Sequence, residues 1–163
     1  MKGKLLLAGA VLVFGICNLM ILEKESLLAR GHVMLLRTLP YDPRSLMQGD
    51  YMQLRYELCD GPAELATRDG PRTGQLVVRL DEHRVAAYLR VHEGGELARG
   101  EQLLRYRRVQ HGLRVGAETF FFQEGHADQY RQAAFAEFKV DEDGSTVLVG
   151  LRGRDFERLG PQK

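Results

Sequence analysis

Three acidic side chains in two separated segments are of the type that acid–base chemistry would use. Asp42 and Asp50 lie within residues 42–51, and Glu124 lies far downstream beside Gly125. A cleft holding all three carboxylates would be a site for general acid–base catalysis or ligand binding. Their spacing singles out no pair, so a small-molecule-binding or hydrolytic domain that uses residues 42–51 and Glu124 stays open as an alternative.

A serine hydrolase would take Ser45 as its nucleophile, because this serine lies in the same loop, four residues before Gly49. Membrane-bound signal peptidases also place such a loop and a Gly-Asp pair after an N-terminal anchor, but their Ser-Met-x-Pro pattern is missing here. Serine attack needs a base, usually lysine or histidine. The lysines after residue 30 are Lys139, expected on the polar face of a strand, and Lys163 at the terminus. The sequence therefore disfavours this chemistry.

Histidines are the other residues that could bind a metal. They stand alone at positions 32, 83, 92, 111 and 126, with no His-x-His or His-x-x-x-His pair. Glu124-Gly125-His126 could supply two ligands near a loop, and a sheet could bring a third. Lone histidines in loops are more often solvated, so we expect neither a metal site nor a cofactor.

Residues 5–22 form an apolar run with no charged side chain and one amide, Asn18. As a helix this run spans roughly 27 Å, close to the hydrocarbon thickness of about 30 Å. Lys2 and Lys4 precede it, and every acidic residue follows position 22. Cationic flanks stay in the cytoplasm, so the run predicts an uncleaved transmembrane helix that leads outwards from the cytoplasm. The lipid bilayer is the expected partner of this run, and the helix is expected to continue to about Arg30.

Two other fates share this N-terminal pattern. A cleaved signal peptide needs small residues at the −3 and −1 positions after the apolar stretch, whereas this stretch ends in Met-Ile-Leu-Glu-Lys-Glu. Lipidation at Cys17 needs a small preceding residue, and Ile16 is bulky. Cleavage and lipidation therefore stay as minor alternatives to the uncleaved anchor.

The remainder of the chain is close to neutral. After residue 22 it carries 21 basic and 22 acidic side chains, because Lys2 and Lys4 are the only charged residues before that point. No basic stripe of the kind that nucleic acids require is present, so we expect no nucleic-acid partner. Cys17 lies in the apolar run and Cys59 beyond it. They cannot pair within one chain, and no disulfide framework is expected.

Two local clusters each have a structural and a functional interpretation. The arginines at positions 105, 107, 108 and 114 make one hairpin locally basic, which favours a solvated face and leaves anionic lipid headgroups as an alternative. The aromatic residues 120–122 alternate across a strand, which favours core packing and leaves contact with a membrane partner as an alternative.

Beyond the apolar run, apolar and polar residues alternate with a period of two, which is typical of β-strands. The expected strands are residues 33–39, 52–58, 75–81, 85–92, 102–110, 113–122, 134–141 and 146–152. One short helix is expected at residues 126–133, and Asp143-Gly144 is the sharpest hairpin signal.

This pattern predicts a mainly β fold, an antiparallel sandwich or partly open barrel of about eight strands with one short helix, preceded by the transmembrane helix. We expect residues 1–30 to form the cytoplasmic end, the anchor and its helical extension. Residues 31–163 are expected to form one extracytoplasmic domain, periplasmic or extracellular.

The most distinctive stretch is residues 42–56, which reads DPRSLMQGDYMQLRY. It resembles the signature of the GDYxxLxY family of bacterial membrane-anchored proteins. The matching positions are Gly49, Asp50, Tyr51, Leu54 and Tyr56, preceded by Asp42 and Arg44 in an Asp-Pro-Arg-x-Leu motif. A second motif matches at Phe121-Phe122-Gln123-Glu124-Gly125, where family members often have proline in place of Gln123.

The resemblance covers the anchor and nearly all of the outer domain, and it implies a membrane-anchored protein of a family without an established activity. Similar proteins are often encoded beside polytopic membrane proteins of unknown function, so the resemblance implies a partner of that kind. An uncleaved anchor, a neutral outer domain and the lack of a coherent catalytic set together favour a membrane-tethered interaction or accessory module over an enzyme.

The signature also has a physical interpretation of its own. Gly49 can adopt a positive φ where a loop turns into a strand, and Asp50 can cap that turn by accepting hydrogen bonds from loop amides. Leu54 and Tyr56 are two residues apart, so they share one strand face, expected to be the core. Tyr51 has the opposite parity and should face away. A structural turn is therefore favoured for Gly49 and Asp50, with direct ligand binding or catalysis as the alternative.

Overall fold

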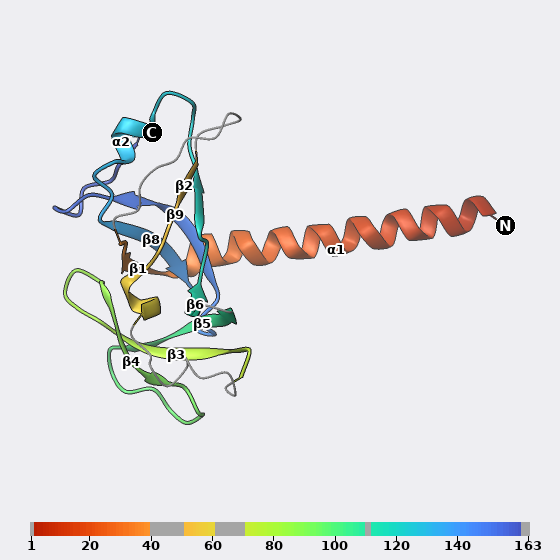
Figure 1. The fold of residues 1–163 in the computed structure, drawn as a ribbon. Coiled ribbons are helices and arrows are strands. Elements are labelled where there is room, and N and C mark those ends of the chain that lie inside the picture. The colour runs from red at the N-terminus through yellow and green to blue at the C-terminus, as the bar shows by residue number, and fades with distance from the viewer. Residues whose placement is uncertain (1, 40–50, 61–70, 110–111, 161–163) are drawn as a thin grey trace.

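The computed structural model describes residues 2–39, 51–60, 71–109 and 112–160, with the side chains of residues 2, 5, 6 and 8 outside the description (Figure 1). The helices are α1 (Lys2–Arg30), the short 3₁₀ helix η1 (Glu57–Asp60) and α2 (Ala127–Tyr130). The strands are β1 (His32–Arg37), β2 (Tyr51–Gln53), β3 (Thr73–Leu80), β4 (Ala86–Val91), β5 (Glu101–Val109), β6 (Gly112–Val115), β7 (Thr119–Phe121), β8 (Phe135–Val140) and β9 (Thr146–Arg152).

The expected mainly β, antiparallel fold is confirmed, with nine strands in the described residues. They form three sheets, with strand orders β1-β8-β9, β2-β7 and β4-β3-β5-β6. The sheets curl around a shared core as a partly open half-barrel (Figure 1). The predicted Asp143-Gly144 hairpin joins β8 to β9. Its tip also touches the four-stranded sheet, because the main-chain nitrogen of Arg105 donates to the carbonyl oxygen of Gly144 at 2.9 Å.

The core follows from the two-residue period of the strands. Met34 and Leu36 of β1, Leu104 of β5 and Phe138 of β8 are all buried and belong to one apolar cluster. Side chains that alternate in sequence point to opposite faces of a strand, so each strand contributes every second residue to this cluster. The central strand β3 is buried on both faces over residues 76–78.

Helix α1 projects from the β body and ends at Arg30, where the sequence predicts its end (Figure 1). Gly31 alone separates it from β1, and its main-chain nitrogen donates to the carbonyl oxygen of Leu27 at 2.8 Å. Leu27 is buried, and the Lys139 ammonium donates to the carbonyl oxygen of Gly31 at 2.9 Å. These contacts dock the end of the helix against β8 and β9.

No helix among the described residues combines the length and the mean hydropathy of a membrane span.

Two predicted strands are wrong in extent. The run 113–122 is divided into β6 and β7, because Gly116 has φ +58° and lies against the ring of Phe138. The run 52–58 leaves its partner strand early. After Gln53 the chain passes from β7 towards the end of β1, where Tyr56 forms a bridge with Thr38, and then enters η1. Burial still alternates from Met52 to Leu58.

The predicted helix at residues 126–133 is shorter than expected, because α2 spans only Ala127–Tyr130. The residues that follow are committed to sheet contacts: the main-chain nitrogen of Ala134 donates to the carbonyl oxygen of Arg152 at 2.9 Å. The amide of Thr38 in turn donates to the carbonyl oxygen of Ala134, also at 2.9 Å. Such bonds are incompatible with a continuing helix.

A buried carboxylate fastens the segment after β9 to the three-stranded sheet. Glu137 of β8 is 2% exposed and accepts hydrogen bonds from two guanidinium groups. Arg152 Nε lies 2.8 Å from its Oε2, and an Arg158 terminal nitrogen lies 2.8 Å from its Oε1. Burial opposes the charged form, but these bonds outweigh it and hold the pKa of Glu137 below its ordinary value.

Candidate functional site

The described part of the signature begins as a two-stranded ribbon. β2 pairs with β7 in antiparallel register, with Tyr51 opposite Phe121 and Gln53 opposite Thr119. The ribbon continues through one further hydrogen bond, from the Leu54 amide to the carbonyl oxygen of Glu118 at 2.7 Å. The first and second sequence motifs, far apart along the chain, are therefore hydrogen-bonded neighbours.

Leu54 and Tyr56 lie in the core, on the face that their parity predicts. The Tyr56 ring packs edge-on against Phe138 with centroids 5.7 Å apart, and its hydroxyl donates to the carbonyl oxygen of Ala117. Burial raises the pKa of Tyr56 far above its ordinary range, so this phenol stays protonated and acts as a donor. These contacts give both residues a packing role.

Tyr51 points away from the core, again as its parity predicts. Its ring lies 6.1 Å from that of Phe121, which is 74% exposed. The neighbouring Phe120 and Phe122 turn the other way and pack on Tyr130, at centroid distances of 5.1 and 4.9 Å. The triple aromatic run is thus mostly core packing, with one exposed ring beside Tyr51.

Glu124 and Gly125 form an exposed turn between β7 and α2. Gly125 has φ +82°, and the turn closes with a hydrogen bond from the His126 amide to the carbonyl oxygen of Gln123 at 3.1 Å. A positive φ favours glycine at this position, which gives Gly125 a backbone reason to be there. Glu124 is exposed and makes no ion pair with any described residue.

Four of the predicted site residues, Asp42, Arg44, Gly49 and Asp50, lie outside the described residues, as does Ser45. The expected convergence of Asp42 and Asp50 with Glu124 therefore stays a prediction. The described residues that flank this stretch are Leu39, whose amide donates to the carbonyl oxygen of Arg55 at 2.8 Å, and Tyr51.

A groove of about 550 Å³ adjoins the described part of the signature. Its walls are residues 37–39 at the end of β1, residues 52–54, residues 130–135 between α2 and β8, and Arg154 in the turn after β9. Hydrogen bonds hold two of these walls together, since the Thr38 hydroxyl donates to the carbonyl oxygen of Ala133 at 3.2 Å.

A family model described as GDYXXLXY protein matches residues 13–151. The chain belongs to the GDYXXLXY family. Neither the curated proteins nor the solved structures that were compared with the chain include a match.

The GDYXXLXY signature contributes Met52, Gln53 and Leu54 to the groove. Part of the signature that identifies the family therefore forms one wall of the groove. The charged residues in the described lining are all positive. Arg37, Arg131 and Arg154 line the groove, and its described lining contains no aspartate or glutamate.

The local sequence does not predict that these three arginines lie near one another. They come from the end of β1, the end of α2 and the turn after β9, and only the pairing of β1, β8 and β9 brings them together. Arginines are scattered along the whole sequence, and nothing in the local spacing of these three marks them as neighbours.

The described residues offer no group of three or more metal-binding side chains. His126 lies in the turn before α2, with no second histidine beside it in the sequence. Cys59 is half-buried, and burial raises the pKa of its thiol to about 11, so it is a neutral and weak nucleophile at physiological pH. Arginines and apolar side chains are prominent among the groups with which the described part of this GDYXXLXY protein lines the groove.

Proposed function

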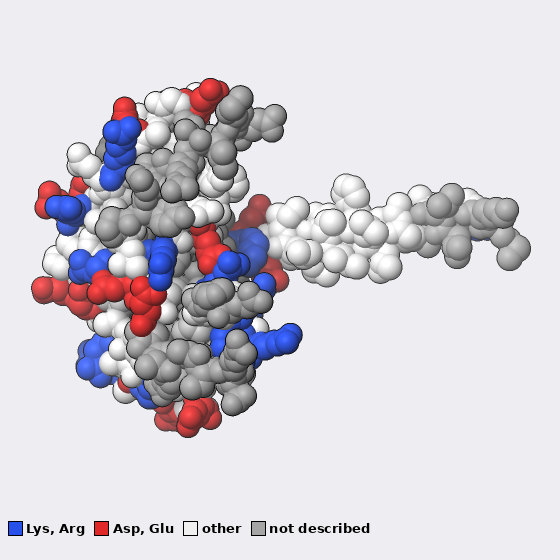
Figure 2. All heavy atoms as spheres, in the orientation of Figure 1, with Lys and Arg blue, Asp and Glu red and all other residues white. Residues whose placement is uncertain are grey.

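We propose that the chain is a single-pass membrane-anchored accessory module, whose β domain lies outside the cytoplasm and binds a membrane protein partner. The observation that carries the proposal is the surface of α1. Large apolar side chains are exposed along it, among them Leu7, Val11, Phe14 and Leu19, each by more than 60%. Figure 2 shows the described middle of the helix without any charged atoms. A helix that is apolar on all sides needs an apolar surrounding.

The apolar run of the sequence spans residues 5–22, and the side chains at positions 5, 6 and 8 within it lie outside the described structure. Lys2 and Lys4 before this run and the acidic residues after it support an orientation with the N-terminus in the cytoplasm. The β domain then faces the periplasm or the exterior of a bacterial inner membrane.

A polytopic membrane protein is the proposed partner. Tethering confines the β domain to the membrane surface and raises its effective concentration for a neighbour in the same membrane. The short junction at Gly31 supports this role, because it leaves little freedom between the helix and the β body. A domain that is held close to the membrane needs only modest affinity to stay bound.

The membrane arrangement is tested with a reporter that is active only outside the cytoplasm, fused after Lys163. We expect activity in the full chain and retention in the membrane after alkaline carbonate extraction. A matched variant, Leu12→Arg with Phe14→Arg, should lose both, because each arginine at mid-helix costs about 3 kcal/mol of insertion free energy. Cytoplasmic activity of the unaltered fusion would overturn the orientation.

The partner is tested by crosslinking in intact membranes followed by purification in mild detergent. We expect one defined polytopic protein to co-purify with the full chain and to be lost with the Leu12→Arg, Phe14→Arg variant. Recovery of no membrane protein, or of the same set from both chains, would refute the accessory role.

A further inference from the structure

The groove lies at the end of the three-stranded sheet that is remote from α1. β1 starts next to the helix at His32 and reaches the groove at Arg37, and β8 runs back from Phe135 to Val140. Six strand residues at about 3.3 Å each place the groove roughly 20 Å beyond the helix end. Figure 1 shows α2 on the side of the body away from the projecting helix. A ligand in the groove therefore comes from outside the membrane.

The charges of the described lining residues favour an anionic ligand. Arg37, Arg131 and Arg154 stand on three separate walls, and no described lining residue is acidic. Arg154 makes no ion pair with any described residue. Guanidinium groups bind carboxylates through paired hydrogen bonds, which are among the stronger polar contacts in proteins.

Arg37 is held in place by a row of stacked rings. Its guanidinium carbon lies 5.2 Å from the centroid of the Phe135 ring. Phe156 stacks on Phe135 at 4.9 Å, and His83 stacks on Phe156 at 4.5 Å. A cation over an aromatic face is attracted to it and loses little freedom on binding a ligand, so this row preorganises one wall of the groove.

Arg37 and Arg131 each make an ion pair that a ligand carboxylate could replace. Arg37 lies 3.2 Å from Glu57 and Arg131 lies 2.9 Å from Asp128, with every one of these side chains more than half exposed. Exposed ion pairs contribute at most about 1 kcal/mol. An incoming carboxylate that is partly shielded by the groove can replace them.

The base of the groove is formed by core side chains: Met52, Leu54, Tyr130 and Phe135 line it, and each is at most 8% exposed. Three guanidinium groups on separate walls match several carboxylates along one chain better than they match a single small anion. We infer that the groove binds an extended acidic peptide segment of an extracytoplasmic partner region. This inference rests on the proposed accessory function and names the chemistry of the partner segment.

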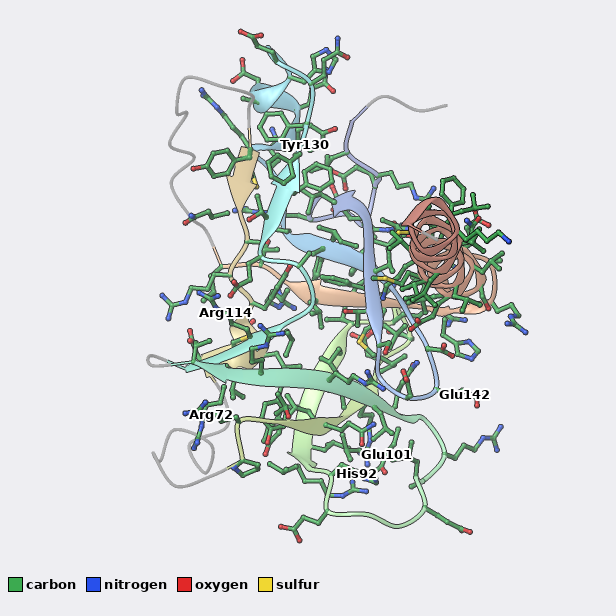
Figure 3. The ribbon with its side chains drawn as sticks, turned by 90° about the vertical axis from the view of Figure 1, so that its right-hand side faces the viewer. Arg72, His92, Glu101, Arg114, Tyr130 and Glu142 are labelled. Atoms are coloured by element: carbon green, nitrogen blue, oxygen red, sulfur yellow. The ribbon has the colours of Figure 1, made fainter. Side chains whose placement is uncertain are left out.

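The test uses the full chain in detergent micelles and a short fluorescein-labelled peptide in which glutamate and leucine alternate, followed by fluorescence anisotropy. We expect binding that weakens with salt, and a loss of at least about ten-fold in affinity for Arg154→Glu and for Arg131→Glu. Arg99→Glu is the control of equal charge change. Arg99 lies in the loop before β5, and Figure 3 places the neighbouring Glu101 at the opposite end of the body from Tyr130.

Equal losses in Arg154→Glu and Arg99→Glu would overturn the inference, because they would reflect only the overall charge. Tighter binding of the matching lysine–leucine peptide would overturn it too, as would Arg154-dependent binding of phosphatidylglycerol vesicles or inorganic polyphosphate in place of the peptide. Membrane extraction of Arg154→Glu separates the proposed anchor from the proposed peptide site. We expect this variant to stay in the membrane, so a negative peptide test would count against the peptide site and not against the anchor.

Discussion

The hydroxyl of Tyr56 donates a hydrogen bond to the main-chain carbonyl oxygen of Ala117, which joins the last residue of the GDYXXLXY signature to the turn between β6 and β7. Tyr56 is 1% exposed, and its ring packs on Phe138 of the three-stranded sheet. One side chain thus connects the signature to a turn and to a second sheet. The signature tyrosine at this position is a packing residue with a polar anchor.

Replacing Tyr56 with phenylalanine should lower the free energy of unfolding by about 1–2 kcal/mol, because the part-buried carbonyl of Ala117 loses its donor. The measurement is chemical denaturation of the full chain in detergent micelles, followed by circular dichroism.

Tyr106→Phe is the matched control for this substitution. The Tyr106 hydroxyl is buried without a hydrogen-bond partner in the described structure. Its removal should be neutral or stabilising, because the phenol pays a desolvation penalty that no bond offsets. Equal destabilisation by the two substitutions would show that the Tyr56 hydrogen bond has no special weight.

Stability should fall at alkaline pH. Burial raises the pKa of Cys59 from 9.0 to about 11, and it raises that of Tyr56 above its ordinary 10.0. Both groups hold their protons more tightly when folded, so their stabilising effect is complete below pH 9 and is lost as the pH rises through the folded pKa values. Cys59→Ala should reduce the slope of unfolding free energy against pH between 9 and 11. An unchanged slope would contradict the burial of the thiol.

Glu137→Gln should destabilise the protein by about 2–3 kcal/mol, less than the full loss of a buried pair because Arg158 is largely exposed. Glu142→Gln in the β8–β9 hairpin is the control, since this glutamate is exposed and the change should stay within about 0.5 kcal/mol. Thermal melts of both variants at neutral pH provide the comparison.

The Glu137 carboxylate also predicts that the free energy of unfolding falls at acid pH. The pKa of Glu137 is held below its ordinary value of 4.5, so its contribution is complete above pH 4.5 and is lost as the pH falls through the folded pKa. In Glu137→Gln this part of the acid-induced loss of stability should be absent. If the free energy of unfolding falls by the same amount at acid pH in both proteins, other carboxylates cause the acid sensitivity.

Gly31→Ala should weaken the junction between α1 and the β body. A Cβ at this position would lie 2.5 Å from the carbonyl oxygen of Leu27 and 3.2 Å from the amide nitrogen of Val140, both main-chain atoms. Relieving this overlap should cost about 1–3 kcal/mol and lower the midpoint of thermal unfolding. Gly150→Ala in β9 is the control, because nothing lies within 4 Å of its added Cβ. Similar melting points for the two variants would show that the junction adapts.

The sequence by itself determined the properties that depend on neighbours along the chain. The two-residue period predicts the strands, and the parity of Leu54, Tyr56 and Tyr51 predicts which of them is buried. The Asp143-Gly144 turn predicts the β8–β9 hairpin. These features follow from local geometry, because a strand alternates its side chains whatever it pairs with.

Only the tertiary structure decided where the strands stop and which residues meet. The division of 113–122 depends on Gly116 turning over Phe138, and the early end of β2 depends on the bridge between Tyr56 and Thr38. The three groove arginines, at positions 37, 131 and 154, meet because β1, β8 and β9 form one sheet. Such contacts join residues far apart in sequence, and their energies depend on packing across the core, which no local pattern encodes.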